Sequence, residues 1–452
     1  MPLKPKSKTA DPLSLLGDLV ARARRAGADQ ADAVLVEGVA LSHAQRLGTL
    51  EKLERQEGFD LGLRVIVGRR QAMVSSNDRN ADHGGALVQR ALEMAKTVPE
   101  DPYCGLADPA QLAKSFPELD LEDPEEPAPA ILAERAAAAE DAARAVKGVT
   151  NSEGAQASWS RTAMALVASN GFSGRFAGTN HAVAVAVLAG EGTAMERDDD
   201  WDSKVHGGDL KSAATIGRRA GERAVGRLNA RKMPTAKVPV VYDPRVSSSL
   251  LRHFAGAING SGVARGTSFL KDRMGQSVFR TGIEIVDEPH VKRGHRSVPF
   301  DAEGVATMKR VVVADGVLQT WFLDLASSRQ LKLATTGHAR RGTSGPPGPA
   351  PSNLYLAPGR QTPGELIADI AAGFYVTELM GMGVNGVTGD YSRGAAGFWI
   401  ERGALAFPVH EVTVAGNLKD MFRQLHPAND LEFRTGIDAP TLRVEGMTVA
   451  GA

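Results

Sequence analysis

The chain contains ten histidines, so the first chemistry to test is a metal centre. A helical zinc site of the His-Glu-x-x-His kind places two imidazoles on one face, with the glutamate as general base. His410-Glu411 begins such a string, but Val414 stands where the second histidine should be, and the segment alternates like a strand. His290 and His295 lie in a stretch of Pro, Gly, Lys and Arg, and we interpret them as solvated loop residues.

Other chemical signatures are equally sparse. Residues 260–266 are rich in glycine, but they follow an expected helix and include no lysine, unlike a nucleotide-binding loop, so we predict a flexible turn. Residues 198–200 and Asp202 offer the oxygen ligands that Ca²⁺ and Mg²⁺ prefer. No EF-hand pattern is completed, and a solvated charged loop is the expected structure. The single cysteine, Cys104, excludes an internal disulfide and a multi-thiolate zinc site.

Hydrophobic periodicity predicts the elements that would position functional residues in the first half. Helices are expected at about residues 13–26, 86–97, 128–146 and 209–228, and strands at 33–37, 61–67, 71–74, 164–169 and 180–189. Asn170-Gly171 is a turn pair typical of a β-hairpin between the last two of these strands.

The second half is expected to open with a strand at residues 238–242 and then a helix. Asp243-Pro244 is a good N-cap followed by proline at the first helical position, and an apolar stripe continues to Ile258. Further along, β-type runs dominate, at residues 305–313, 317–323, 397–400 and 411–414. We predict an α+β fold with a mixed α/β N-terminal domain at residues 1–231 and a β-rich C-terminal domain at residues 232–452.

Composition excludes several classes of protein. Lys plus Arg equals Asp plus Glu at 53 each, and this zero net charge argues against nucleic-acid binding. The first 12 residues have no apolar stretch behind their lysines, so no signal peptide is expected. The longest apolar run, residues 182–189, is far below the ~18 residues that a membrane span needs. The expected location is the cytoplasm.

Long strings in the second half are distinctive. They are residues 240–246, 257–261, 268–270, 336–340, 375–381, 389–399 and 411–421. In this order they resemble the TldD/PmbA metalloprotease family, and specifically its PmbA branch, also called TldE. The resemblance continues more weakly through the first half. It implies a mixed N-terminal domain and a C-terminal domain dominated by antiparallel β-structure.

The resemblance also implies where a zinc motif would lie. In the TldD branch a His-Glu-x-x-x-His helix binds zinc through its two histidines. Aligned on the preceding leucine pair, the ligand positions fall on Arg252 and Ala257, and the base position falls on His253. Arginine stays protonated at neutral pH, alanine has no ligand atom and histidine is no carboxylate. No catalytic residue or metal is therefore expected in this chain, and zinc is expected in a TldD-like partner.

Three functions remain open. The first is a non-catalytic subunit that pairs with a TldD-like catalytic subunit and helps to hold small or unfolded peptides or peptide precursors as substrates. The second is an active metallopeptidase with unorthodox ligands, including His253. The third is a non-enzymatic regulator, because family members are linked by name to DNA gyrase modulation. A homodimer without the partner is also open.

Two glycine-bounded segments are the candidate peptide- or partner-binding surface. They contain Arg265, Ser268 and Phe269 in one segment and Asp390 and Arg393 in the other. Binding residues tend to lie on loops over a rigid scaffold. The structural alternative is that the glycines only permit tight turns and that Asp390 pairs with Arg393.

Overall fold

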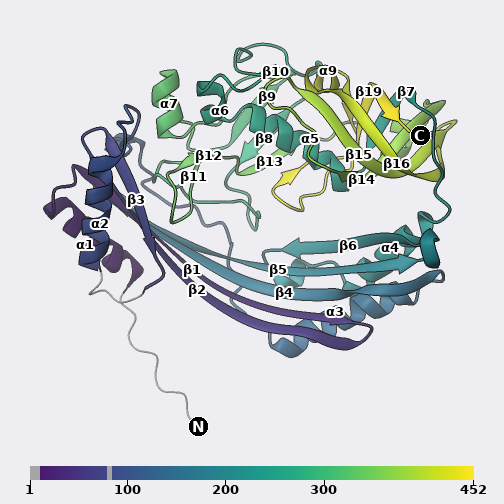
Figure 1. Cartoon of the computed structure of the whole chain (residues 1–452), viewed down its shortest axis with the longest axis horizontal. Helices are drawn as coiled ribbons and strands as arrows, with labels where there is room; N and C mark the ends of the chain where they lie inside the picture. The colour runs from purple at the N-terminus through teal and green to yellow at the C-terminus, as the bar shows by residue number, and fades with distance from the viewer. Residues whose placement is uncertain (1–10, 79–83, 452) are drawn as a thin grey trace, which may run out of the picture.

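The first half of the chain forms one long antiparallel sheet. The computed structural model describes residues 11–78 and 84–451, and it confirms the α+β fold. Six strands lie in the order β3-β2-β1-β4-β5-β6 (Figure 1). Their bounds are β1 (Gln30–Arg46), β2 (Thr49–Val67), β3 (Arg70–Ser76), β4 (Val149–Ala168), β5 (Ser173–Ala189) and β6 (Glu196–Lys204).

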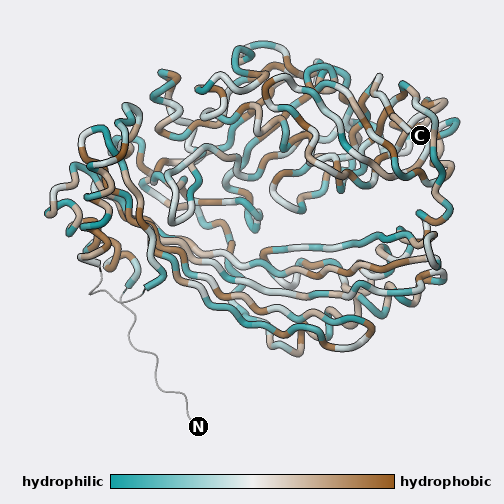
Figure 2. Tube along the Cα trace, in the orientation of Figure 1, coloured by the Kyte–Doolittle hydropathy of each residue, from teal (hydrophilic) through white to brown (hydrophobic). Residues whose placement is uncertain are grey.

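These strands are longer than the sequence predicted. The expected run at residues 61–67 is only the end of β2, whose preceding part, up to residue 58, is almost wholly exposed. Such a segment has no buried face and hence no hydrophobic alternation to detect. Its antiparallel pairing with β1 keeps it extended. Figure 2 shows hydrophilic and hydrophobic residues mixed along these strands. The expected hairpin is confirmed, because Asn170-Gly171 joins β4 to β5.

Four helices cover one face of the sheet (Figure 1). Leu35 and Leu63 pack against one helix pair, and Trp159 and Val185 pack against the other. The opposite face carries a cluster that includes Phe300 from the second half of the chain. The helices lie close to their predicted positions, at α1 (Pro12–Arg25), α2 (Gly84–Thr97), α3 (Pro129–Arg144) and α4 (Ala213–Gly226).

The contact between α3 and α4 depends on a glycine. A Cβ atom at Gly217 would lie 2.0 Å from the carbonyl oxygen of Ala139. We expect Gly217→Ala to lower the free energy of unfolding by about 1–3 kcal/mol, because the two helices must separate. Gly256 is the matched control: it is also helical but has no atom within 4 Å of its Cβ position, so Gly256→Ala should stabilise by up to about 1 kcal/mol. Urea unfolding curves measure both, and equal effects would contradict the packing argument.

A ring of strands organises the second half. Its sheet has the order β16-β15-β14-β7-β19-β17, and an additional pairing of β16 with β19 closes the ring. Only β7 and β14 are parallel within it. The strands are β7 (Ala236–Tyr242), β14 (Ala372–Met380), β15 (Asp390–Glu401), β16 (Ala404–Asn417), β17 (Leu425–Pro427) and β19 (Leu442–Ala450).

A second sheet and short helices complete this half. The sheet has the order β10-β9-β8-β13-β18, and β11 pairs with β12 separately. These strands are β8 (Ile285–Glu288), β9 (Arg310–Ala314), β10 (Val317–Leu318), β11 (Ala339–Arg340), β12 (Gly348–Pro349), β13 (Asn353–Leu356) and β18 (Ile437–Asp438). The helices are α5 (Pro244–Ala257), α6 (Gly260–Ala264), α7 (Leu325–Leu331), α8 (Pro363–Ile367) and α9 (Leu418–Arg423).

The acidic run is buried, and the predicted solvated loop is wrong. It lies on β6, where the alternate side chains of Asp198, Asp200 and Asp202 are at most 5% exposed. Buried carboxylates need cationic partners. Arg245 of α5 places Nη1 2.9 Å from Oδ1 of Asp198, and Arg434 reaches Asp200. The sequence indicates a solvated loop because the run completes no EF-hand pattern, and its partner arginines are distant in the chain.

A second buried charge cluster joins the two halves. Asp32 of β1 accepts hydrogen bonds from Arg64 of β2 and from Arg341, which follows β11. All three side chains are at most 3% exposed. The cluster on β1 therefore attaches the second half to the sheet face that the helices leave uncovered. The carboxylates on β6 lie on the other face of this edge strand, beside α4, where Asp200 also pairs with Arg223. No helix among residues 11–78 and 84–451 is long and apolar enough to cross a membrane.

Candidate functional site

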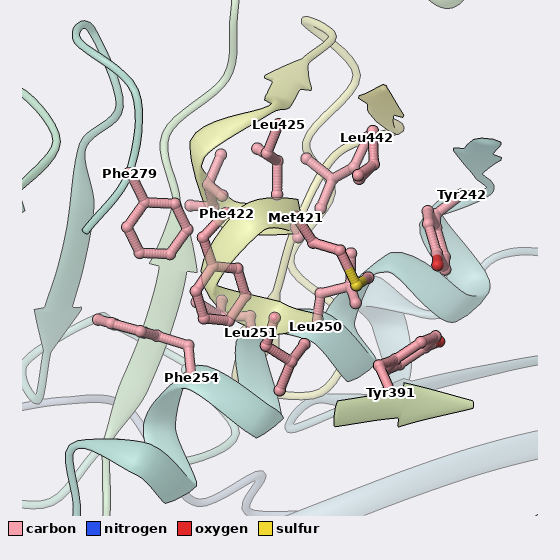
Figure 3. Packing of buried hydrophobic residues seen from close by; sticks show 14 of the residues in the cluster. Tyr242, Leu250, Leu251, Phe254, Phe279, Tyr391, Met421, Phe422, Leu425 and Leu442 are labelled. Carbon is pink, nitrogen blue, oxygen red and sulfur yellow. The ribbon is translucent and has the colours of Figure 1, made fainter. Parts of the chain in front are cut away.

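Helix α5 carries the three positions where the resemblance places a zinc motif. Asp243 caps its first turn by accepting from the backbone N–H of Arg245. Leu250, Leu251 and Phe254 face the core, where they pack toward α9, as Figure 3 shows. This orientation leaves the neighbouring positions 252 and 253 at the side of the helix.

Arg252 and Ala257 make contacts that stabilise the fold. The guanidinium of Arg252 is exposed and donates from Nη2 to the hydroxyl of Thr435 at 3.2 Å. The methyl group of Ala257 is buried, and its carbonyl accepts from the hydroxyl of Ser268. Ser268 also accepts from the backbone N–H of Leu270 at 3.0 Å, so its hydroxyl ties the end of α5 to the following turn.

His253 is the one of the three with an available ligand atom. Its ring packs edge-on against Tyr391, with 6.1 Å between the ring centroids. Its Nε2 is buried and makes no hydrogen bond within residues 11–78 and 84–451. Burial lowers the pKa of His253, and the positive charge of Arg393 lowers it further. Both effects favour the neutral imidazole.

No constellation of donors surrounds this histidine. Within the described part of the chain, no group of three or more His, Cys, Asp or Glu side chains is placed to hold a metal ion. His410 and Glu411 lie on β16, as their alternation predicted. His410 faces Glu196, and Glu411 pairs with Lys232 at 3.0 Å.

The two glycine-bounded segments meet at one surface. The backbone N–H of Phe269 donates to the carbonyl of Gly386 at 3.1 Å. The ring of Phe269 also lies 3.5 Å from the Cβ position of Gly389, which precedes Asp390. The structure therefore brings Phe269 and Asp390 together from segments more than 100 residues apart. Arg265 is exposed at the end of α6, so the predicted flexible turn is a short helix.

Asp390 and Arg393 do not pair with each other. Asp390 accepts from the hydroxyl of Thr388 at 2.6 Å and from Nδ2 of Asn417 at 2.9 Å. These hydrogen bonds, first from Thr388 and then from Asn417, lower the pKa of Asp390. Arg393 instead donates from Nε to the carbonyl of Met380 at 3.0 Å. Asp390 thus stabilises its own turn.

Two adjoining hollows lie beside these residues. We call them together the basic groove, lined by side chains from residues 268–278 and 417–423 and by Val387. Their volumes are about 430 and about 320 Å³. Phe269 and Ser268 line the groove, but four cations that sequence reasoning missed also line it: Lys271, Arg273, Lys419 and Arg423. Only the fold brings residues 271 and 419 together, so no local signal could reveal them.

Comparison with known proteins agrees with this architecture. Family models described as PmbA/TldA metallopeptidase domain 1, central domain and C-terminal domain match residues 31–95, 122–228 and 235–451. The metalloprotease PmbA of Escherichia coli O157:H7 is 36% identical over 94% of this chain and 92% of its own length.

Solved structures share the whole fold. A candidate modulator of DNA gyrase from Bacteroides thetaiotaomicron superposes with a TM-score of 0.89 at 28% identity, covering 97% of this chain and 98% of that one. TldE from Thermococcus kodakarensis has a TM-score of 0.86 at 19% identity, with 97% and 100% coverage. The matched domains and the shared fold are those of a metallopeptidase family. The chain belongs to the PmbA/TldD metallopeptidase family.

Proposed function

We infer that this chain is a PmbA/TldE-type subunit that has no zinc of its own and acts with a TldD-like catalytic subunit. Together they would cleave small or unfolded peptides and peptide precursors in the cytoplasm. The observation that carries the proposal is the set of side chains on α5. They replace both expected zinc ligands and the expected base, while the rest of the family fold is retained.

The chemistry of these side chains does not fit a zinc site. The guanidinium of Arg252 stays protonated and points to Thr435, and Ala257 has no ligand atom. His253 has a free Nε2, but one imidazole falls short of the three protein ligands of a catalytic zinc site. No carboxylate of α5 is available as general base, because the helix contains no Asp or Glu.

Metal analysis and mixing test this proposal. The purified, dialysed chain should hold no stoichiometric zinc, and His253→Ala should leave the metal content unchanged. Alone it should not cut an unfolded peptide. Adding it to a TldD-like partner should raise the rate of cleavage by about tenfold or more, equivalent to about 1.4 kcal/mol of the activation barrier.

Two results would overturn the subunit role. Cleavage by the partner at the same rate with and without this chain would remove it. Near one zinc per chain, lost in His253→Ala, would favour instead an active metallopeptidase with unorthodox ligands. The unpartnered Nε2 of His253 is the observation that keeps this second candidate open.

A further inference from the structure

The basic groove carries an excess of positive charge on a neutral chain. Lys271, Arg273, Lys419 and Arg423 line it against Asp272 and Asp420, which leaves two positive charges in excess. Asp390 at its edge is held by Thr388 and Asn417. All four cationic side chains belong to exposed residues. An anion can therefore approach them at little desolvation cost.

These cations are not held in ion pairs by the residues that the structure describes. Within residues 11–78 and 84–451, none of the four forms an ion pair, whereas Lys204, Lys211 and Lys232 do. Arg273 donates to the neutral amide of Gln276 at 2.8 Å. The charge of Lys419 also acts on Asp390, after the hydrogen bonds from Thr388 and Asn417, and lowers the pKa of that carboxyl. Because no carboxylate in the described part of the chain is bonded to any of the four cations, they can still meet carboxylates from outside.

The floor of the groove is apolar. Phe269 and Phe422 lie with ring centroids 6.4 Å apart, and Leu270 and Val278 line the same hollow as Phe422. Leu270 and Phe422 are at most 3% exposed, so these walls are fixed by the core. Hollows of about 430 and about 320 Å³ are of the size that takes individual side chains or a small ligand. The groove combines a rigid apolar floor with a cationic rim.

We propose that the basic groove binds an extended peptide segment that carries several carboxylates, with its apolar side chains on the aromatic floor. This names the substrate class of the proposed function and rests on it. Charge complementarity selects the acidic peptide. A folded protein partner is a poorer occupant than a peptide. A stable protein–protein interface buries ~800 Å² on each side and does not need hollows, whereas the side chains of an extended peptide fit into them.

Fluorescence anisotropy with the purified full chain tests the proposal without any peptidase. The probe is a fluorescein-labelled, C-terminally amidated peptide of repeating Gly-Glu-Leu units, compared with its Gly-Gln-Leu counterpart. The glutamate peptide should bind more tightly, and added salt should weaken it because salt screens exposed charges. The double variant Lys271→Ala/Lys419→Ala should raise its Kd by about fivefold or more.

The matched control removes two exposed lysines far away in sequence. Lys114→Ala/Lys147→Ala changes the net charge equally but should leave the Kd unchanged, and thermal melting should show both double variants folded. Equal affinity for the two peptides, or equal loss in both variants, would overturn the proposal.

The outcome is separable from that of the subunit proposal. If the chain binds the glutamate peptide but does not stimulate a TldD-like partner, the groove proposal is supported and the subunit proposal is wrong. If the chain stimulates the partner but does not prefer the glutamate peptide, the subunit proposal is supported and the groove proposal is wrong.

Discussion

Replacing Asp32 by alanine is expected to lower the free energy of unfolding by about 3–5 kcal/mol. The substitution would leave the guanidinium groups of Arg64 and Arg341 buried together without a counter-charge. The side chains of all three are at most 3% exposed, so water cannot replace the missing carboxylate. Because Arg341 comes from the second half of the chain, the loss should weaken the attachment of that half to the sheet.

The pH dependence of Asp32 has a definite sign. Burial by itself would raise its pKa, but the charges of Arg341 and Arg64 outweigh burial, and the pKa is lowered. The folded state then holds fewer protons than the unfolded state as the pH falls through the ordinary pKa of about 3.9. The stabilisation by Asp32 is complete above that pH and is lost below it, so the Asp32→Ala penalty should shrink in acid.

Urea unfolding at neutral and acidic pH measures this penalty. Glu122 provides the control, because it pairs with Arg161 through side chains that are 43% and 40% exposed. Glu122→Ala should cost at most about 1 kcal/mol, since exposed ion pairs contribute little. An Asp32→Ala effect no larger than that of Glu122→Ala would contradict the assignment of this cluster as an attachment point.

How far the sequence predicts the fold depends on whether an element buries one face. The helix α5 was predicted from Asp243, Pro244 and its apolar stripe, because capping and amphipathicity are local properties. The exposed part of β2 and the buried acids of β6 were missed, because their structure depends on strand pairing and on distant arginines. Local pattern does not contain that information.

The candidate site, like the fold, was predicted only in part from the sequence. The glycine-bounded segments were predicted from their combination of turn glycines and charge, and the structure does place Phe269 beside Gly389. Asp390 and Arg393 were not expected to bond to Thr388 and Met380, because such contacts depend on turn geometry. Ser268 was predicted as a binding residue, yet its hydroxyl bonds to the backbone of Ala257. The sequence alone does not show which residues from other segments lie beside Ser268, Asp390 and Arg393.

Glu303→Gln is expected to stabilise the chain increasingly as the pH rises. Glu303 is almost fully buried, and its Oε2 accepts from the backbone N–H of Leu325 at 2.9 Å. Burial raises the pKa of Glu303, and the charge of the neighbouring Asp301 raises it further, although Arg64 opposes the shift. A glutamine keeps the acceptor for Leu325 but cannot ionise.

The sign follows from proton binding. Above the ordinary glutamate pKa of about 4.3, the unfolded chain loses the proton that folded Glu303 still holds, so rising pH favours unfolding. The cost grows by up to about 1.4 kcal/mol per pH unit until the folded group also ionises. Glu303→Gln removes this pH-dependent cost, because glutamine does not ionise. Its advantage over the original chain should be absent near pH 4 and exceed about 2 kcal/mol near pH 8.

The same substitution at Glu140 provides an internal control with the opposite sign. Glu140 is also buried, but although burial raises its pKa, hydrogen bonds from Ser152, Gln45 and the backbone of Gly48 and Leu47 lower it overall. Its stabilisation is present above the ordinary pKa and is lost in acid, so Glu140→Gln should destabilise at neutral pH. Urea unfolding from acid to mild alkali should therefore show the two variants diverging. If both lose stability as the pH rises, the carboxyl of Glu303 is ionised in the folded chain and the assignment fails.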